Sequence, residues 1–289
     1  MKFQKSPWCK ICINLRHEPL PIIIITWYND LHCQVKWGDC YSEWFMVTAG
    51  VRQGGVLSPD FYSIYVDDLI MELRSLNIGC YYMSIFVAAL FYADDMAILA
   101  PSIKGLTTLL IACDCYCKEW DICLNAKKSK ILPFGRKVEN MQAINLNGNA
   151  IEVVTEWVYL GVTLRSDKVF NCSVTDRIKK FYRCANAIFR IDGHSNDTVM
   201  LHLIETHCVP LLTYGIEIIH VKDRDERRQL RVAYNSVFRK IFGYRWSESV
   251  TALQGFLCRP TWEELVERRQ SSFFARAANH HLAKELPIL

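Results

Sequence analysis

The residues best suited to chemistry are two adjacent carboxylates, Asp94 and Asp95, which follow Tyr92 and Ala93. They lie within an almost wholly apolar stretch, residues 81–100, whose composition is typical of buried strands. Two charges between buried strands are costly unless a cation or the donors of a turn compensate them. A tight hairpin turn would present both carboxylates to one point, and Mg²⁺ binds one or two protein carboxylates while leaving room for substrate phosphates. The pattern therefore indicates a magnesium site for phosphoryl transfer, with an ordinary Asp-Asp turn as the alternative.

A second acidic pair offers a comparison within the same chain. Asp67 and Asp68 also follow a tyrosine and one apolar residue, but their surroundings have the spacing of a helix that extends to about residue 74. Ser58 is suited to cap the N-terminus of this helix, and Pro59 is suited to be its first residue. We therefore expect Asp67 and Asp68 on the solvated side of a helix rather than at a metal.

The segment before this helix, residues 50–55, is rich in glycine and also contains Arg52 and Gln53. Such loops let the backbone approach a ligand closely, and the N-terminus of a helix favours phosphate. The segment matches neither a Walker loop nor a dinucleotide fingerprint, because the required lysine and glycine spacing are missing. It indicates a nucleotide contact or, alternatively, only a tight turn.

The rest of the pattern predicts an α+β fold followed by an all-helical region. The expected elements are a hairpin over residues 33–48 that turns at Gly38 and Asp39, a helix over 103–120, and strands near 131–132 and 158–164. From about residue 170 the apolar spacing is helical, with Val174, Phe181 and Ala185 on one face. We place the boundary near residues 165–172 and predict two domains, 1–168 and 169–289.

One predicted helix, residues 223–242, has two different faces. Leu230, Tyr234, Val237 and Ile241 form an apolar stripe. A polar stripe, which we call the arginine stripe, consists of Arg224, Arg228, Arg231, Asn235 and Arg239. A helix docked by one face with arginines on another is suited to follow a phosphate backbone, although a solvated charged face would have the same pattern. For the nearby Trp246 we favour packing in the core over stacking on a nucleobase.

Composition limits the class of protein. The chain has 289 residues, 51% of them hydrophobic and 22% charged, with a net charge of +4, which is not the composition of a disordered chain. It has thirteen cysteines and a polar N-terminus without a secretory signal, so we expect an intracellular protein, cytoplasmic or nuclear and not secreted. Residues 81–100 are long enough to span a membrane, but the two aspartates inside them argue against it.

The order of these segments resembles the reverse transcriptases of non-LTR, LINE-type retrotransposons. The segments that carry the resemblance are residues 50–59 with the following helix, residues 92–95, residues 124–130 and residues 157–161. They are similar, in this order, to motifs B, C, D and E of that family, and the resemblance covers about residues 10–250. It implies an antiparallel, palm-like sheet with helices and partial fingers, followed by a helical, thumb-like region.

The resemblance also implies roles for individual residues. Asp94 and Asp95 are then the palm carboxylates that bind catalytic Mg²⁺. The expected contacts with template and nucleotide are Arg52, Gln53, Gly54, Gly55 and Tyr92. Lys128 is the candidate beside the leaving pyrophosphate, with Lys127 and Lys130 as competitors, and a solvated lysine cluster as the alternative.

Further roles follow from the same resemblance. Tyr159, Leu160 and Gly161 belong to the hairpin that grips the primer, although their pattern fits a buried strand equally well. Arg224, Arg228, Arg231 and Arg239 contact the nucleic-acid backbone. The implied partners are an RNA template, a DNA primer and deoxynucleoside triphosphates, with no membrane.

One expected residue is missing. The family carries another metal-binding aspartate in motif A, upstream of the glycine-rich segment. The acidic residues upstream of Gly50 are Glu18, Asp30, Asp39 and Glu43, and none has such a setting. We expect that this aspartate, with most of the fingers, lies before the chain begins, and that the chain alone is inactive. The alternative function is a non-catalytic nucleic-acid-binding module derived from a reverse transcriptase.

Overall fold

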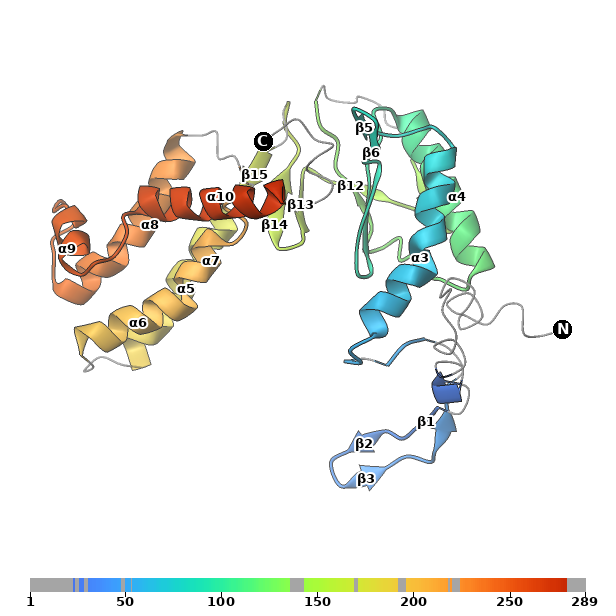
Figure 1. Cartoon of the computed structure of the whole chain (residues 1–289), viewed down its shortest axis with the longest axis horizontal. Coiled ribbons are helices and arrows are strands. Elements are labelled where there is room, and N and C mark those ends of the chain that lie inside the picture. The colour runs from blue at the N-terminus through green and yellow to red at the C-terminus, as the bar shows by residue number, and fades with distance from the viewer. Residues whose placement is uncertain are drawn as a thin grey trace. The chain divides into compact units, whose positions relative to one another are not determined.

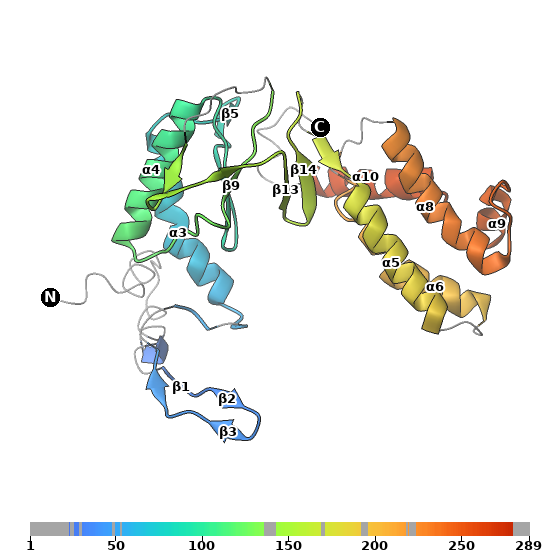
Figure 2. The same ribbon diagram turned by 180° about the vertical axis from the view of Figure 1, so that it is seen from behind.

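The computed structural model describes most of the chain, namely residues 23, 26–28, 31–47, 50–52, 54–135, 143–168, 171–191, 196–217, 219 and 224–279. The chain divides into two compact units. Unit 1 comprises residues 1–129 and 140–152, and unit 2 comprises residues 130–139 and 153–289. Figures 1 and 2 show the elements of each unit from two opposite sides.

Unit 1 begins with a small β structure. Strand β1 (His32–Cys33) pairs with β4 (Phe45–Met46), and β2 (Lys36–Trp37) pairs with β3 (Cys40–Tyr41). The turn between β2 and β3 is formed by Gly38, which has a φ of +60°, and Asp39, so the predicted hairpin is confirmed.

Two helices, α3 (Ser58–Ser75) and α4 (Ile103–Glu119), pack against each other in unit 1. Their apolar faces form its core, which contains Leu69, Leu73, Leu109, Cys113, Tyr116 and Cys117. The Tyr116 hydroxyl donates to the Tyr65 backbone carbonyl at 2.9 Å and ties α4 to α3. Asp67 and Asp68 are exposed on α3, as predicted.

Helix α3 begins one residue earlier than predicted, so Pro59 is its second residue rather than its first. Ser58 does not cap the helix but is its first residue, and Leu57 occupies the capping position without a side-chain hydrogen bond. The hydroxyl of Ser58 instead donates to the backbone carbonyl of Arg52 at 2.6 Å. This bond closes the glycine-rich loop. The Ser58 side chain therefore stabilises the loop and does not cap the N-terminus of the helix.

The apolar stretch of residues 81–100 folds as strands. It contains two hairpins, β5 (Tyr81–Tyr82) with β6 (Ile85–Phe86), and β7 (Ala89–Tyr92) with β8 (Asp95–Ile98). No helix within the described residues is long and apolar enough to cross a membrane. Four short strands complete the series up to residue 153: β9 (Lys130–Ile131), β10 (Asn145–Leu146), β11 (Asn149–Ala150) and β12 (Glu152–Val153).

Unit 2 contains strand β9, a three-stranded sheet and helices. The antiparallel sheet consists of β13 (Glu156–Tyr159), β14 (Val162–Arg165) and β15 (Asn171–Ser173). Residues 158–164, which we expected as a single strand, are therefore a hairpin. The helices are α5 (Thr175–Ile191), α6 (Asp197–His207), α7 (Val209–Thr213), α8 (Arg224–Phe242), α9 (Thr251–Phe256) and α10 (Trp262–Ala278).

The core of unit 2 lies between α5, α6 and α8, which contact one another (Figure 1). The predicted apolar faces are buried. They comprise Val174 directly before α5, Phe181 and Ala185 on α5, and Leu230, Tyr234 and Val237 on α8. The chain is thus a mixed α+β protein of small antiparallel sheets with helices, followed by a mainly helical region. The expected fold class is confirmed at this level.

Candidate functional site

The two candidate metal ligands lie at the tip of the β7–β8 hairpin. Tyr92 pairs with Asp95 in the antiparallel register, so Ala93 and Asp94 form a two-residue turn. Ala93 adopts a φ of +50°, a left-handed conformation that is uncommon outside glycine. Asp94 and Asp95 are both exposed, because the strands bury their other end, where Ala89 joins the core. The hairpin therefore presents two neighbouring carboxylates to solvent.

Tyr62 on α3 is the residue near this turn that the sequence did not single out. Its pKa is raised above the usual value, first by burial and then by the negative charge of Asp94. The helix that follows the glycine-rich loop and the turn with the two aspartates therefore come together in unit 1. A phenol with a raised pKa stays protonated and keeps its hydroxyl as a donor.

Asp94 and Asp95 provide some, but not all, of the ligands expected around a hard cation. Carboxylate oxygens that are accessible to solvent are appropriate ligands for Mg²⁺, which also retains waters and binds phosphates. However, no group of three or more His, Cys, Asp or Glu side chains in the described part of the chain is placed to hold a metal ion. Asp94 and Asp95 can thus provide two ligands of such a site, and a third carboxylate is not beside them among the described residues.

The glycine-rich loop is closed by hydrogen bonds to one carbonyl. The Arg52 carbonyl accepts from the Gly55 backbone N–H at 3.0 Å and from the Ser58 hydroxyl at 2.6 Å. A Cβ at Gly55 would lie 2.6 Å from the Ser58 Oγ and 3.2 Å from the Arg52 carbonyl oxygen, so a side chain there would displace the serine hydroxyl. Arg52 and Gly54 are exposed beside the N-terminus of α3, and Gln53 lies outside the described residues.

The three candidate lysines have different surroundings. Lys127 and Lys128 are exposed in a turn after α4, where the backbone N–H of Lys128 donates to the Asn125 carbonyl at 3.1 Å. Lys130 belongs to β9 in unit 2, and its ammonium lies 5.7 Å from the centre of the Trp157 ring. A cation over an aromatic face is held by the ring quadrupole. Lys130 is therefore engaged locally, whereas Lys127 and Lys128 present their charges to solvent.

Tyr159, Leu160 and Gly161 form the end of the β13–β14 hairpin in unit 2. Leu160 and Gly161 make the turn with φ values of +46° and +78°. The Tyr214 hydroxyl donates to the Leu160 carbonyl at 2.9 Å, and its ring would lie 3.1 Å from a Cβ at position 161. The interpretation of this segment as one buried strand is wrong, because the chain reverses here between β13 and β14.

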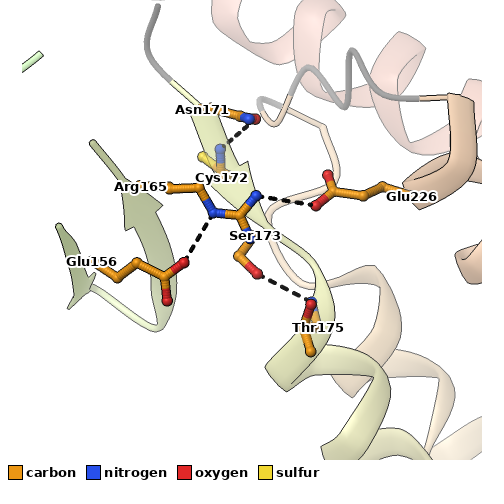
Figure 3. Close-up of polar contacts among 7 residues, drawn as sticks. All are labelled: Glu156, Arg165, Asn171, Cys172, Ser173, Thr175 and Glu226. Carbon is orange, nitrogen blue, oxygen red and sulfur yellow. Dashed lines mark hydrogen bonds and ion pairs between the residues drawn. The ribbon is translucent and has the colours of Figure 1, made fainter. Parts of the chain in front are cut away.

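An arginine connects this hairpin to the helix that carries the arginine stripe. The Arg165 Nε lies 2.9 Å from the Glu156 Oε1, and its Nη1 lies 3.7 Å from the Glu226 Oε1 on α8 (Figure 3). Glu226 is only 9% exposed, so its charge requires a partner of opposite sign. The neighbouring Ser173 hydroxyl accepts from the Thr175 backbone N–H at 3.4 Å where the sheet leads into α5. Arg165 therefore connects the β13–β14 hairpin of the small sheet to α8.

The arginine stripe of α8 lines a groove of about 440 Å³, which we call the α8 groove. Arg228, Arg231, Asn235 and Arg239 all contribute to it. Arg224 instead lines a neighbouring cavity of about 590 Å³. Trp246 also lines the groove and is 68% exposed, so our expectation that it packs in the core is wrong.

Comparisons with known proteins identify the family of the chain. Residues 3–164 match the family model described as reverse transcriptase (RNA-dependent DNA polymerase). The chain is 27% identical over 279 residues to the probable RNA-directed DNA polymerase from transposon BS of Drosophila melanogaster, an alignment that covers 91% of this chain and 30% of that protein.

Two further relatives are also proteins of mobile elements. The RNA-directed DNA polymerase from mobile element jockey of Drosophila melanogaster is 24% identical over 251 residues, which are 83% of this chain and 27% of that protein. The Pol polyprotein from type-1 retrotransposable element R2 of Nasonia vitripennis is 27% identical over 166 residues, 53% of this chain and 16% of that protein. The chain spans less than a third of the length of each of these relatives. Because the family model matches more than half of its 289 residues, the chain belongs to the reverse transcriptase (RNA-dependent DNA polymerase) family.

Proposed function

We propose that the chain is part of an RNA-directed DNA polymerase of a non-LTR retrotransposon, which copies an RNA template from a DNA primer with deoxynucleoside triphosphates. The observation that carries this proposal is the tip of the β7–β8 hairpin. At this tip, Asp94 and Asp95 are exposed to solvent. Tyr62 lies near Asp94 and belongs to α3, the helix that follows the glycine-rich loop. Phosphoryl transfer needs carboxylates of this kind beside a place for phosphates.

Within unit 1, Asp94 and Asp95 would hold Mg²⁺, and the loop of Arg52, Gln53, Gly54 and Gly55 would lie against template and nucleotide, with Tyr92 beside them. Mg²⁺ supplies a positive charge that stabilises the charge developing on the transferred phosphoryl group. Lys128 would place its ammonium near the leaving pyrophosphate, and its exposed position supports this role over that of Lys130. Tyr62 would keep a proton donor beside Asp94.

The roles that we propose for residues from Tyr159 onward concern the binding of nucleic acid rather than the chemical step. Tyr159, Leu160 and Gly161 would hold the primer at the turn that Tyr214 supports. Arg224, Arg228, Arg231 and Arg239 would follow the nucleic-acid backbone. In this proposal residues 1–168 are a partial palm with fingers and residues 169–289 a thumb. The Arg165 bridge supports the proposed grip, because it joins the β13–β14 hairpin to α8 within unit 2.

We further propose that the polypeptide of these 289 residues binds a primer–template but does not extend the primer by itself. A third carboxylate at the metal site is missing among the described residues, and each 1.36 kcal/mol added to the barrier slows the reaction about tenfold. Glu18 and Asp30 lie outside the described residues. The second candidate function, a non-catalytic nucleic-acid-binding module, is favoured by the α8 groove, because the groove belongs to unit 2 whereas Asp94 and Asp95 belong to unit 1.

Metal binding at the hairpin tip tests the first proposal. We expect Asp94→Asn with Asp95→Asn to weaken Mn²⁺ binding, followed by electron paramagnetic resonance, by at least about tenfold, since even the loss of an outer-shell partner can cost this much. The matched control is Asp67→Asn with Asp68→Asn, because that pair is also exposed but lies on a helix. Equal Mn²⁺ affinity in the two double variants would refute the metal site at the hairpin.

A further inference from the structure

The α8 groove has an aromatic wall in addition to its arginines. Trp246 follows α8 in the loop before α9, and the guanidinium of Arg239 lies 5.4 Å from the centre of its ring. The Arg239 Nε also donates to the Glu248 carbonyl at 3.0 Å. These two contacts hold the arginine and the tryptophan together, while 68% of the tryptophan remains exposed. An indole fixed in this way offers a flat surface to a ligand.

The polar floor of the groove is also fixed. Gln254 of α9 is 1% exposed, and its Nε2 donates to the Asn235 Oδ1 at 3.2 Å. A buried amide needs such a partner, so the bond orders Asn235 in the middle of the arginine stripe. Arg228 and Arg239 are eleven residues apart on α8, which corresponds to about 17 Å along the helix axis. The groove is therefore a preformed and elongated surface.

The charges of the groove favour an anion. Arg228, Arg231 and Arg239 line it together with the carboxylates Glu248 and Glu263. The Arg231 Nη1 lies 3.6 Å from the Glu263 Oε1, but both side chains are more than half exposed, and such surface ion pairs are weak. The Glu248 carboxylate accepts from the backbone N–H of Arg245 in its own turn. Arg228 and Arg231 thus remain available to phosphates, whereas Arg239 is held by Trp246 and the Glu248 carbonyl.

We infer that the α8 groove binds single-stranded nucleic acid, with one unpaired base stacked on Trp246 and the adjacent phosphates on Arg228 and Arg231. This inference rests on the proposed function and makes it more specific, because a row of arginines alone would serve a duplex equally well. An exposed indole adds a preference for a base whose face is free. The groove volume of about 440 Å³ is in the range of sites that enclose one small ligand group.

The test compares a fluorescent single-stranded RNA of about 12 nucleotides, a length within the range of known single-strand sites, with the same strand in a blunt duplex. We expect Trp246→Ala to weaken binding of the single strand about tenfold and binding of the duplex little, since stacking of one base is lost. The matched control is Phe256→Ala, an aromatic side chain that is 85% exposed and does not line the groove. Trp246→Phe should restore most of the affinity.

A second readout separates failure of this inference from failure of the proposed function. Arg228→Gln with Arg231→Gln should lower the slope of log affinity against log salt by about 1.4, because each phosphate contact on a single strand contributes about 0.7. If the arginine variants weaken binding but Trp246→Ala acts like Phe256→Ala, the single-strand site is wrong and the backbone grip stands. If the full chain binds neither RNA in a salt-dependent way, the proposed function itself fails. An equal loss of duplex and single-strand binding in Trp246→Ala would also overturn the preference for an unpaired base.

Discussion

Phe181→Ala is expected to destabilise unit 2 by about 3–5 kcal/mol, the usual cost of removing a fully buried phenylalanine side chain. Phe181 is 0% exposed on α5 and belongs to the same core cluster as Leu230 and Phe238 of α8. The cavity would remove packing from the core that α5 shares with α8, the helix that carries the arginine stripe. Since a whole domain is commonly stable by only about 5–15 kcal/mol, this loss is a substantial part of the stability of the helical region.

The measurement is hydrogen exchange of peptides from α5 and α8, read across a urea series. Phe256→Ala serves as the control, because the same atoms are removed from a side chain that is 85% exposed. Surface substitutions of this kind change stability by about 0.5 kcal/mol or less. Similar exchange in the two variants would show that the α5–α8 core does not stabilise unit 2.

Gly79→Ala is expected to destabilise unit 1 by about 2–6 kcal/mol, the sum of overpacking and backbone strain. Gly79 has a φ of +112°, and a Cβ there would lie 2.3 Å from the Ala88 Cβ and 3.3 Å from the Leu99 carbonyl oxygen. The Leu99 backbone N–H donates to the Ala88 carbonyl at 2.7 Å. The clash therefore displaces the base of the β7–β8 hairpin, whose tip carries Asp94.

Two readouts follow this change. Amides of residues 80–99 should exchange faster in Gly79→Ala, and Mn²⁺ binding by the hairpin tip should weaken with them. Gly255→Ala is the matched control, because that glycine lies in α9 with a negative φ and no heavy atom within 4 Å of the added Cβ. Alanine there should be neutral or stabilising by up to about 1 kcal/mol. Unchanged exchange in residues 80–99 would show that the hairpin base tolerates the added methyl group.

The features that follow from local periodicity could be predicted from the sequence. The buried faces of α5 and α8 recur every three or four residues, so Phe181 and Tyr234 were placed correctly in the core. The hairpin with Asp94 at its turn was predicted for a similar reason, since charged residues between two apolar strands are stable where the chain turns. In both cases the local pattern and the tertiary environment favour the same structure.

Other features depend on contacts between distant residues, and the sequence does not show them. The turn at Leu160 and Gly161 interrupts an apolar run, and its support comes from Tyr214, far along the chain. Tyr62 was missed because only its approach to Asp94 distinguishes it from other tyrosines. Trp246 was expected in the core, whereas it is 68% exposed and lies beside the guanidinium of Arg239.

The most direct test of the central claim is a primer-extension assay on an RNA template with Mg²⁺, in which the same samples are also analysed for complex formation. The chain is compared with Asp94→Ala/Asp95→Ala. We predict a complex that weakens as salt rises from about 50 to 200 mM, with an unextended primer for both proteins. Extension by the chain that is lost in the double variant would contradict the account, because another carboxylate would then complete the metal site. Absence of a complex at any salt concentration would contradict the proposed grip on nucleic acid.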